Sequence, residues 1–477
     1  MFVGDGGCRG YRTLQGTVSI AHLLRESKST SQKGVRFLTA DGYQTLMPRI
    51  LVALLLAAVC LGARERQPLP PGVPDTYVGH LAPETKTLLL QKGDRYAICG
   101  DSITEQKMYS RILEAYLAAA RPDLAIECRQ YGWSGETAAG FFGRMKNDVL
   151  RFQPTIASTC YGMNDFRYVP FEAAIGEDYR KNQTKVVQAF KAAGARVVLG
   201  SSGTIHSVPP WVKSAKGTWE TLNLSLLQFR NIDIEVAEAE QVTFADVYWP
   251  MLAKGYESRA KYGDGFKLEG NDGVHPGWAG HVMMATAYLK ALGLDGDLGT
   301  VEVDLAAGSV QAKNGQAASR RPDGAYALRS ERLPCSFEPG DVAKDSTLAA
   351  GLALSDFQAR FNRLTLKVTG ATTPSVKVTW GEQSKVFAAA DLARGINLAA
   401  EFPQGPTKPA FDKIWKAVGD KQAYETKQIK SLFHGKEAKT DMEAVVKASE
   451  VEHAKQVAAL AAAYAPAETV LKFEAVK

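Results

Sequence analysis

The chain has 477 residues, of which 45% are hydrophobic and 23% charged, a composition typical of folded proteins rather than disordered or membrane-embedded ones. This length exceeds what one hydrophobic core usually serves, so we expect more than one structural unit. Residues 1–63 hold seven Lys/Arg and three Asp/Glu, so the formal charge of +6 falls to +2 over the rest of the chain. Such a small balance gives no electrostatic reason to expect nucleic acid or an anionic membrane as a partner.

The first feature along the chain is an apolar run, ILVALLLAAVCLG, at residues 50–62. It is too short to span a bilayer but has the length of a signal-peptide core, and Met47-Pro48-Arg49 supplies the positive start. We therefore expect a signal peptide at residues 47–63, an exported protein that is periplasmic or secreted, and no integral membrane span in the mature chain. A buried helix or a membrane anchor is the alternative. Residues 1–46 then form an upstream extension that we expect to be disordered, and residues 64–90 a linker and lead-in.

Six cysteines are present, four of them beyond the presequence. None of them forms a CxxC pair, so neither a zinc site nor a dense disulfide framework is predicted, while a single disulfide stays open. Lipoprotein anchoring through Cys60 is not expected, because Val59 precedes it where a small residue is needed.

From about residue 91, short β-branched runs alternate with helix-length segments. The predicted strands are Arg95–Cys99, Leu124–Tyr131, Thr155–Tyr161, Arg196–Ser202 and Val242–Tyr248. The predicted helices are Ile103–Ala120, Thr137–Phe152, Phe171–Ala193, Trp219–Glu240 and Gly277–Leu292. Strands that alternate with helices predict an α/β domain over residues 91–295, with a parallel sheet covered by helices on both faces.

The pattern changes after Gly293. Residues 296–404 carry short strand patterns such as TVEVDL and SVKVTWG between Gly, Pro and Asp turns, which predicts a β-rich accessory region. Residues 405–477 turn helical and charged, with a break near His434, which predicts an α-helical hairpin that packs on the rest of the protein. A partner-binding arm is the alternative, and the oligomeric state is unknown.

Three short motifs lie at the ends of predicted strands or beside the last helix. Gly100-Asp101-Ser102 follows the first strand, GMND at residues 162–165 follows the third, and DGVHP at residues 272–276 precedes the last helix. The carboxyl ends of parallel strands meet at one edge of a sheet, so we expect Ser102 and Asn164 to lie together.

The chemistry that these residues allow is acyl transfer. A serine hydroxyl needs a neighbouring base, and His275 is suitable, with Asp272 on the same loop to fix its tautomer. The alternative is that Ser102 is only a helix cap. The oxyanion donors would be the backbone N–H of Ser102, that of Gly135 in the WSGET loop (residues 133–137), and the Asn164 amide. Gly132 is the alternative to Gly135.

The blocks GDSIT, WSGET, GMND and DGVHP, in this order, resemble the signature blocks of the SGNH hydrolase superfamily, also called GDSL-type esterases and lipases. The resemblance spans about residues 90–295. It implies a flavodoxin-like α/β/α sandwich with a parallel sheet, and no metal or organic cofactor. Asp101 and Asp165 are interpreted as structural. The site residues that it implies are the catalytic Ser102, Asp272 and His275 and the oxyanion-hole residues Ser102, Gly135 and Asn164.

Three further side chains are predicted to contact the substrate. Trp133 and Phe166 flank the motifs, and His206 lies in a Gly/Ser loop after the fourth predicted strand.

The expected function is an exported serine esterase that removes small acyl groups, acetyl above all, from acylated carbohydrates, through a Ser-Asp-His triad and an acyl-enzyme. The resemblance to polysaccharide-acting esterases supplies the carbohydrate part of this expectation. The alternatives are a lysophospholipase or thioesterase and a carbohydrate O-acetyltransferase that uses the same triad. A non-catalytic binding module is disfavoured because every catalytic block is intact.

Overall fold

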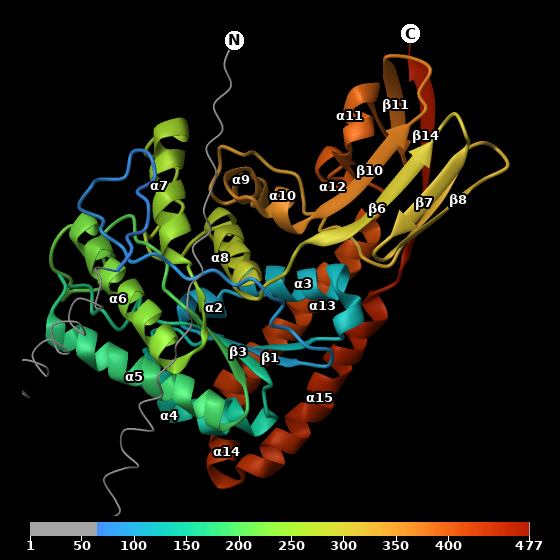
Figure 1. Cartoon of the computed structure of the whole chain (residues 1–477). Coiled ribbons are helices and arrows are strands. Elements are labelled where there is room, and N and C mark those ends of the chain that lie inside the picture. The colour runs from blue at the N-terminus through green and yellow to red at the C-terminus, as the bar shows by residue number, and fades with distance from the viewer. Residues whose placement is uncertain (1–63, 477) are drawn as a thin grey trace, which may run out of the picture. The chain divides into compact units, whose positions relative to one another are not determined.

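The computed structural model describes residues 64–476 (Figure 1). The predicted upstream extension (1–46) and signal peptide (47–63) lie outside the described residues. Within the described part of the chain, no helix is both long enough and apolar enough to cross a membrane. The four cysteines found there are all buried and unpaired by disulfides.

A five-stranded parallel sheet forms the centre of the first part of the chain. Its strand order is β2-β1-β3-β4-β5, which is the flavodoxin-like order. The middle strand β3 is buried at every position, as expected for a parallel strand covered on both faces. The predicted α/β fold is therefore confirmed. The strands are β1 (Arg95–Gly100), β2 (Glu127–Gln130), β3 (Ile156–Cys160), β4 (Arg196–Gly200) and β5 (Thr243–Ala245).

Helices cover both faces of this sheet. On one face α4, α5 and α6 pack side by side, and on the other α3 packs against α8 (Figure 1). Helices α4 and α6 each begin after an N-cap threonine, because the side chains of Thr137 and Thr218 accept hydrogen bonds from backbone N–H groups of the first turn. The bounds are α2 (Ser102–Glu105), α3 (Tyr109–Ala120), α4 (Ala138–Asp148), α5 (Ala173–Ala192), α6 (Trp219–Glu240), α7 (Tyr248–Tyr262) and α8 (Trp278–Ala291), with 3-10 turns η2 (Pro122–Leu124) and η3 (Leu150–Phe152).

Two of these helices differ from the sequence prediction. The helix predicted over residues 103–120 is divided into α2 and α3, because Lys107 between them takes a left-handed backbone with φ +57°. Helix α7 begins at Tyr248, where the sequence predicted the end of a strand.

The β-rich region contains two sheets. The first has the order β13-β10-β6-β7 and the second the order β12-β11-β14-β9-β8. Its strands are β6 (Asp297–Asp304), β7 (Ser309–Lys313), β8 (Gln316–Arg320), β9 (Tyr326–Ser330), β10 (Arg363–Thr369), β11 (Ser375–Trp380), β12 (Gln383–Ala388), β13 (Ile396–Asn397) and β14 (Ala467–Val476). Four short helices lie among them: α9 (Leu348–Leu354), α10 (Phe357–Phe361), α11 (Ala389–Arg394) and α12 (Leu398–Glu401).

The end of the chain departs from the helical region expected over residues 405–477. Strand β14 returns to the β-rich region and pairs with β11 and β9 in the middle of the second sheet. The described residues from Glu65 onward form one compact unit, and the domain boundaries placed after residues 295 and 404 stay predictions.

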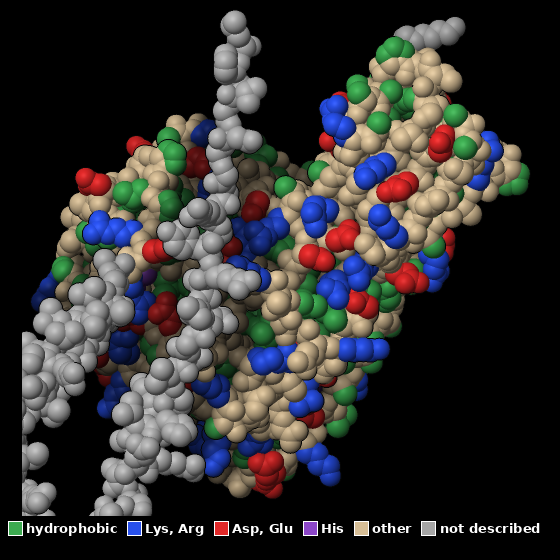
Figure 2. Space-filling model, in the orientation of Figure 1, with side chains coloured by type: hydrophobic (Ala, Val, Ile, Leu, Met, Phe, Trp, Pro, Cys, Tyr) green, Lys and Arg blue, Asp and Glu red, His purple; other side chains and the backbone are tan. Residues whose placement is uncertain are grey.

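The predicted helical hairpin is present and packs on the α/β domain. It consists of α13 (Lys408–Lys427), a π-helical turn η4 (Gln428–Phe433), α14 (Lys436–Thr440) and α15 (Met442–Ala463), with α13 against α3 and β2. Basic and acidic side chains are interspersed on the face drawn in Figure 2, in keeping with the small net charge.

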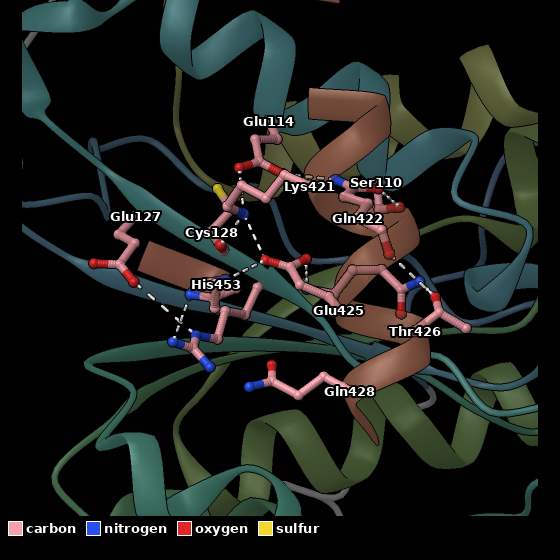
Figure 3. A network of polar contacts seen from close by, with 12 residues as sticks. Ser110, Glu114, Glu127, Cys128, Lys421, Gln422, Glu425, Thr426, Gln428 and His453 are labelled. Carbon is pink, nitrogen blue, oxygen red and sulfur yellow. Dashed lines mark hydrogen bonds and ion pairs between the residues drawn. The ribbon is translucent and has the colours of Figure 1, made fainter. Parts of the chain in front are cut away.

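A buried polar network joins the hairpin to the α/β domain (Figure 3). The Lys421 side chain is 1% exposed, and its ammonium donates to Glu114 of α3 at 2.8 Å, to Glu425 at 2.6 Å and to the Cys128 carbonyl of β2 at 2.6 Å. His453 of α15 contacts Glu425 at 3.0 Å. Because a buried charge is costly unless it is paired, these contacts hold α13 and α15 in one place on the domain.

Candidate active site

The serine of the first motif lies in a tight turn between strand β1 and helix α2. The Asp101 carboxylate caps the helix by accepting a hydrogen bond from the Ile103 N–H at 2.9 Å, and Ser102 is the first helical residue. Gly100 is required here, since a Cβ at this position would lie 2.1 Å from Thr104 Oγ1. As the first residue of the helix, Ser102 has a backbone N–H with no partner inside it.

The structure brings the predicted triad together. His275 Nε2 lies 2.8 Å from Ser102 Oγ, and His275 Nδ1 lies 2.7 Å from Asp272 Oδ2. The other Asp272 oxygen accepts hydrogen bonds from the backbone N–H groups of Val274 and His275, at 2.9 and 2.8 Å. Asp272 therefore holds both the ring and the backbone of the histidine.

The protonation state of Asp272 follows from its burial and from these hydrogen bonds. Partial burial acts to raise the pKa of its carboxyl, but hydrogen bonds from the His275 and Val274 backbone and from the His275 ring outweigh it, and the pKa is lowered. Asp272 is thus ionised at neutral pH and favours the His275 tautomer with its proton on Nδ1. The free Nε2 then accepts the Ser102 hydroxyl proton.

The two candidate glycines, Gly132 just before the WSGET loop and Gly135 within it, have different surroundings. A Cβ on Gly132 would lie 2.2 Å from the Glu105 backbone nitrogen, and the Gly132 N–H donates to the Gln130 side chain. Gly135 has φ +73° and open space where a Cβ would point, and its N–H has no acceptor among residues 64–476. The unpaired N–H favours Gly135 as the oxyanion donor, while Gly132 allows the WSGET loop to approach α2.

Asn164 of the GMND motif lies between Asp101, which precedes the nucleophile, and Glu136 of the WSGET loop. Its amide donates to the Glu136 carbonyl oxygen at 3.0 Å, and Nδ2 is 3.4 Å from Asp101 Oδ2. The second hydrogen bond is longer than usual and therefore weak, so an oxyanion can compete with Asp101 for that amide hydrogen. Glu136 is itself fixed, because Arg144 donates twice to its carboxylate at 2.6 Å.

The two motif aspartates interpreted as structural contact the backbone of their loops. Asp165 accepts from the N–H groups of Ala138 and Gly162 at 2.9 and 3.0 Å, which ties the GMND loop to the start of α4. Burial raises the pKa of Asp101 to about 7 and that of Asp165 to about 6.

Two of the three predicted substrate contacts, Phe166 and Trp133, pack against other side chains. Phe166 is 1% exposed and its ring packs on Tyr168 and Phe229 in the core, and its contact with substrate stays a prediction. Trp133 is partly buried against Arg144 and against the π-helical turn η4.

His206 lies next to the loop of the triad. Its backbone N–H donates to the Gly273 oxygen at 2.9 Å, and burial lowers the pKa of its ring. The ring nitrogen Nδ1 is buried without a partner, so His206 stays a predicted substrate contact.

Sequence reasoning missed an aromatic residue at the site. Trp211, in the loop after β4, is 47% exposed, and its ring centroid lies 5.8 Å from that of His275 at an interplanar angle of 30°. The available signal was an aromatic residue after Pro209-Pro210 in a loop at the carboxyl edge of the sheet. Lys430, which bonds Glu105 of α2, was also missed, and its position in the sequence gives no sign of this contact.

Comparison with known proteins gives the following similarities. Residues 98–283 match the sequence model of the GDSL-like Lipase/Acylhydrolase family. An acetylxylan esterase of Geobacillus stearothermophilus is 23% identical over 228 residues, which cover 43% of this chain and 95% of that protein.

Among solved structures, a gut microbial diltiazem-metabolizing enzyme matches with a TM-score of 0.66 and 23% identity, over 82% of this chain and 99% of its own. This likeness shows a shared fold that extends well beyond the α/β domain. The structure of Axe2, an acetylxylan esterase from Geobacillus stearothermophilus, matches with a TM-score of 0.35 and 21% identity, over 43% of this chain and 97% of its own.

Proposed function

From the match of residues 98–283 to the GDSL-like lipase/acylhydrolase family, the SGNH class of serine ester hydrolases, we propose that the protein is an exported esterase. Its proposed reaction is the removal of acetyl groups from carbohydrates. The observation that carries the proposal is the continuous hydrogen-bonded relay from Ser102 Oγ through His275 to Asp272, at 2.8 and 2.7 Å.

In the first half of the reaction, Ser102 Oγ attacks the acyl carbon while its proton passes to His275 Nε2. Asp272 stabilises the imidazolium that forms. The tetrahedral intermediate then collapses: the bond to the sugar oxygen breaks, the proton on Nε2 goes to that oxygen, and the acyl group stays on Ser102. In the second half, water attacks the acyl-enzyme, with His275 again taking and returning the proton, and acetate leaves.

The oxyanion that forms in both halves is bound by the backbone N–H groups of Ser102 and Gly135 and by the Asn164 amide. These donors are held in place before the substrate arrives, by the turn after β1, by the WSGET loop and by the Glu136 carbonyl. Preorganised donors of this kind act mainly on the transition state, so they raise kcat more than they lower KM.

Two observations support a carbohydrate substrate. The similar acetylxylan esterase is one, and the exposed ring of Trp211 beside His275 is the other. A broad apolar ring with its polar tip in water is suited to stacking on the face of a sugar, so Trp211 would hold the leaving alcohol next to the base that protonates it.

The test is a comparison of esters. The account predicts hydrolysis of p-nitrophenyl acetate, a sharp fall of kcat/KM on p-nitrophenyl octanoate, and acetate release from acetylated xylan or a related polysaccharide. Equal or better rates on the octanoate would overturn the acetyl assignment. Acetyl transfer to an added sugar that exceeds acetate release would identify a transferase instead.

The export part of the proposal rests on the apolar run at residues 50–62. Expression of the full chain in a bacterial host should give a periplasmic or secreted protein whose N-terminus, measured by mass spectrometry, lies just after residue 63. An intact N-terminus on a cytoplasmic product would contradict it.

A further inference from the structure

The C-terminal hairpin reaches the catalytic domain at one charged contact close to the nucleophile. Lys430, in the π-helical turn η4, donates to both carboxylate oxygens of Glu105, at 2.7 and 2.9 Å. Glu105 Oε2 in turn accepts from Ser134, from its N–H at 2.6 Å and from its hydroxyl at 2.5 Å. We propose that Lys430 is a positioning residue for the oxyanion hole, acting through Glu105 and Ser134, and we call these three residues the clamp.

The clamp acts on the part of the WSGET loop that sets the direction of the Gly135 N–H. Ser134 immediately precedes Gly135, so the peptide between them carries the N–H proposed as the oxyanion donor. The bonds to the backbone N–H and the hydroxyl of Ser134 hold its Cα, from which this peptide begins, and so restrict the position and direction of the Gly135 N–H. Gly135 needs such support, because its left-handed backbone (φ +73°) has no side chain to hold it.

Glu105 links the donor to the nucleophile. It is the last residue of α2, whose first residue is Ser102, and the helix is only four residues long. A shift of Glu105 therefore moves the oxyanion donor and the nucleophile relative to each other. Burial acts to raise the pKa of Glu105, but the bonds from Lys430 and Ser134 outweigh it and the pKa is lowered, so the clamp is an ion pair at neutral pH.

The π-helical turn and the residue that follows it, His434, make a second contact with the WSGET loop. The ring of His434 lies edge-on to that of Trp133, with centroids 4.9 Å apart, and Lys430 Nζ lies 5.3 Å from the centroid of the Trp133 ring. Trp133 is thus contacted directly by Lys430 of η4 and by His434 just after it, and Ser134 is linked to η4 through Glu105. A π-helical turn inserts an extra residue into the helix and often marks a functional position.

The turn η4 is itself anchored, which a positioning role requires. Gln428 at its start donates to Ser449 Oγ at 3.0 Å and to Glu450 at 2.6 Å, and Glu450 is paired with Arg129 of the domain at 2.6 Å. The buried network around Lys421 fixes α13 just before it (Figure 3). The hairpin therefore presents Lys430 from a fixed support.

The test compares Lys430→Met with Lys430→Arg, which keeps the charge, and with Lys416→Met as a matched control. Lys416 is a 78% exposed lysine of α13 whose carboxylate partner is Asp420 of the same helix. For Lys430→Met we expect kcat on p-nitrophenyl acetate to fall about tenfold, part of the loss for a missing donor, with KM within about twofold. Lys430→Arg should recover most of kcat, and Lys416→Met should match the wild type.

A double-mutant cycle separates positioning from simple destabilisation. If the clamp acts as a unit, Glu105→Gln should lower kcat by a similar factor, and adding Lys430→Met to it should lower kcat little further. Ser134→Ala, which keeps the N–H bond, gives a milder variant in case the others fold poorly. Additive losses, or a wild-type kcat in Lys430→Met, would overturn the clamp.

The inference rests on the proposed function, and a fluorophosphonate probe keeps the two failures apart. Ser102 Oγ would form a bond to phosphorus while fluoride leaves, with the P=O group in the oxyanion hole, so the labelling rate needs no natural substrate. Wild-type protein that is not labelled at Ser102 refutes the proposed function and the clamp with it. Labelling of Lys430→Met at the wild-type rate refutes the clamp alone, and a rate about tenfold lower supports it.

Discussion

Replacing Asn164 by Ala should remove one oxyanion donor while the triad stays intact. The Asn164 amide donates to the Glu136 carbonyl at 3.0 Å and to Asp101 Oδ2 over a longer 3.4 Å, a weak bond for which a developing charge can compete. Loss of one such donor typically costs about 3 kcal/mol in the transition state, so kcat on p-nitrophenyl acetate should fall about 100- to 1000-fold. KM should stay within about twofold, since the ground-state ester does not need this donor.

The same change also removes an internal hydrogen bond, which costs about 1 kcal/mol of stability. Asn182→Ala is the matched control, because that amide donates to the Asp178 carbonyl at 2.9 Å on α5, away from the motifs. Both variants should show a similar small fall in melting temperature, and only Asn164→Ala should lose activity. A loss of less than about fivefold in a folded Asn164→Ala protein would refute its role as a donor.

Further outcomes follow from the site and from the hairpin. Gly132→Ala should unfold at lower temperature than Gly135→Ala, because its Cβ would lie 2.2 Å from the backbone of α2 whereas that of Gly135 meets open space; equal melting temperatures would contradict this packing. Trp211→Ala should raise KM about fivefold for acetylated oligosaccharides, a loss of about 1 kcal/mol, and leave p-nitrophenyl acetate little changed. An equal effect on both substrates would argue against sugar stacking. Lys421→Met leaves two buried carboxylates without their cation and should lower the free energy of unfolding by about 3–5 kcal/mol, measured by urea titration; a change below about 1 kcal/mol would show that the network contributes little.

Local patterns predicted the features that depend on local chemistry. The alternation of strands and helices predicted the parallel sheet. The motif after the first strand and the motif before the last helix predicted Ser102, Asp272 and His275, which the structure places in hydrogen-bond contact. The division of the first helix was missed because the left-handed Lys107 carries no sequence signal such as Gly or Asn.

Features that depend on distant packing could not be predicted. In sequence, strand β14 directly follows a long helical region and was predicted as part of it, because its pairing with β9 and β11 depends on residues far away along the chain. Phe166 follows a catalytic motif but faces the core, since adjacency in sequence does not decide the side on which a ring lies. Lys430 is 325 residues from Glu105, and one lysine in a charged helix does not differ in sequence from its exposed neighbours.

The most direct test of the central claim is to identify the residue that a fluorophosphonate labels. Peptide mass spectrometry of the inactivated wild-type protein should find one adduct on Ser102, with esterase activity lost in proportion to labelling. The His275→Ala variant should remain unlabelled over the same time, because the relay that activates the hydroxyl is broken. An adduct on another serine, or full labelling of Ser102 with activity retained, would contradict the account.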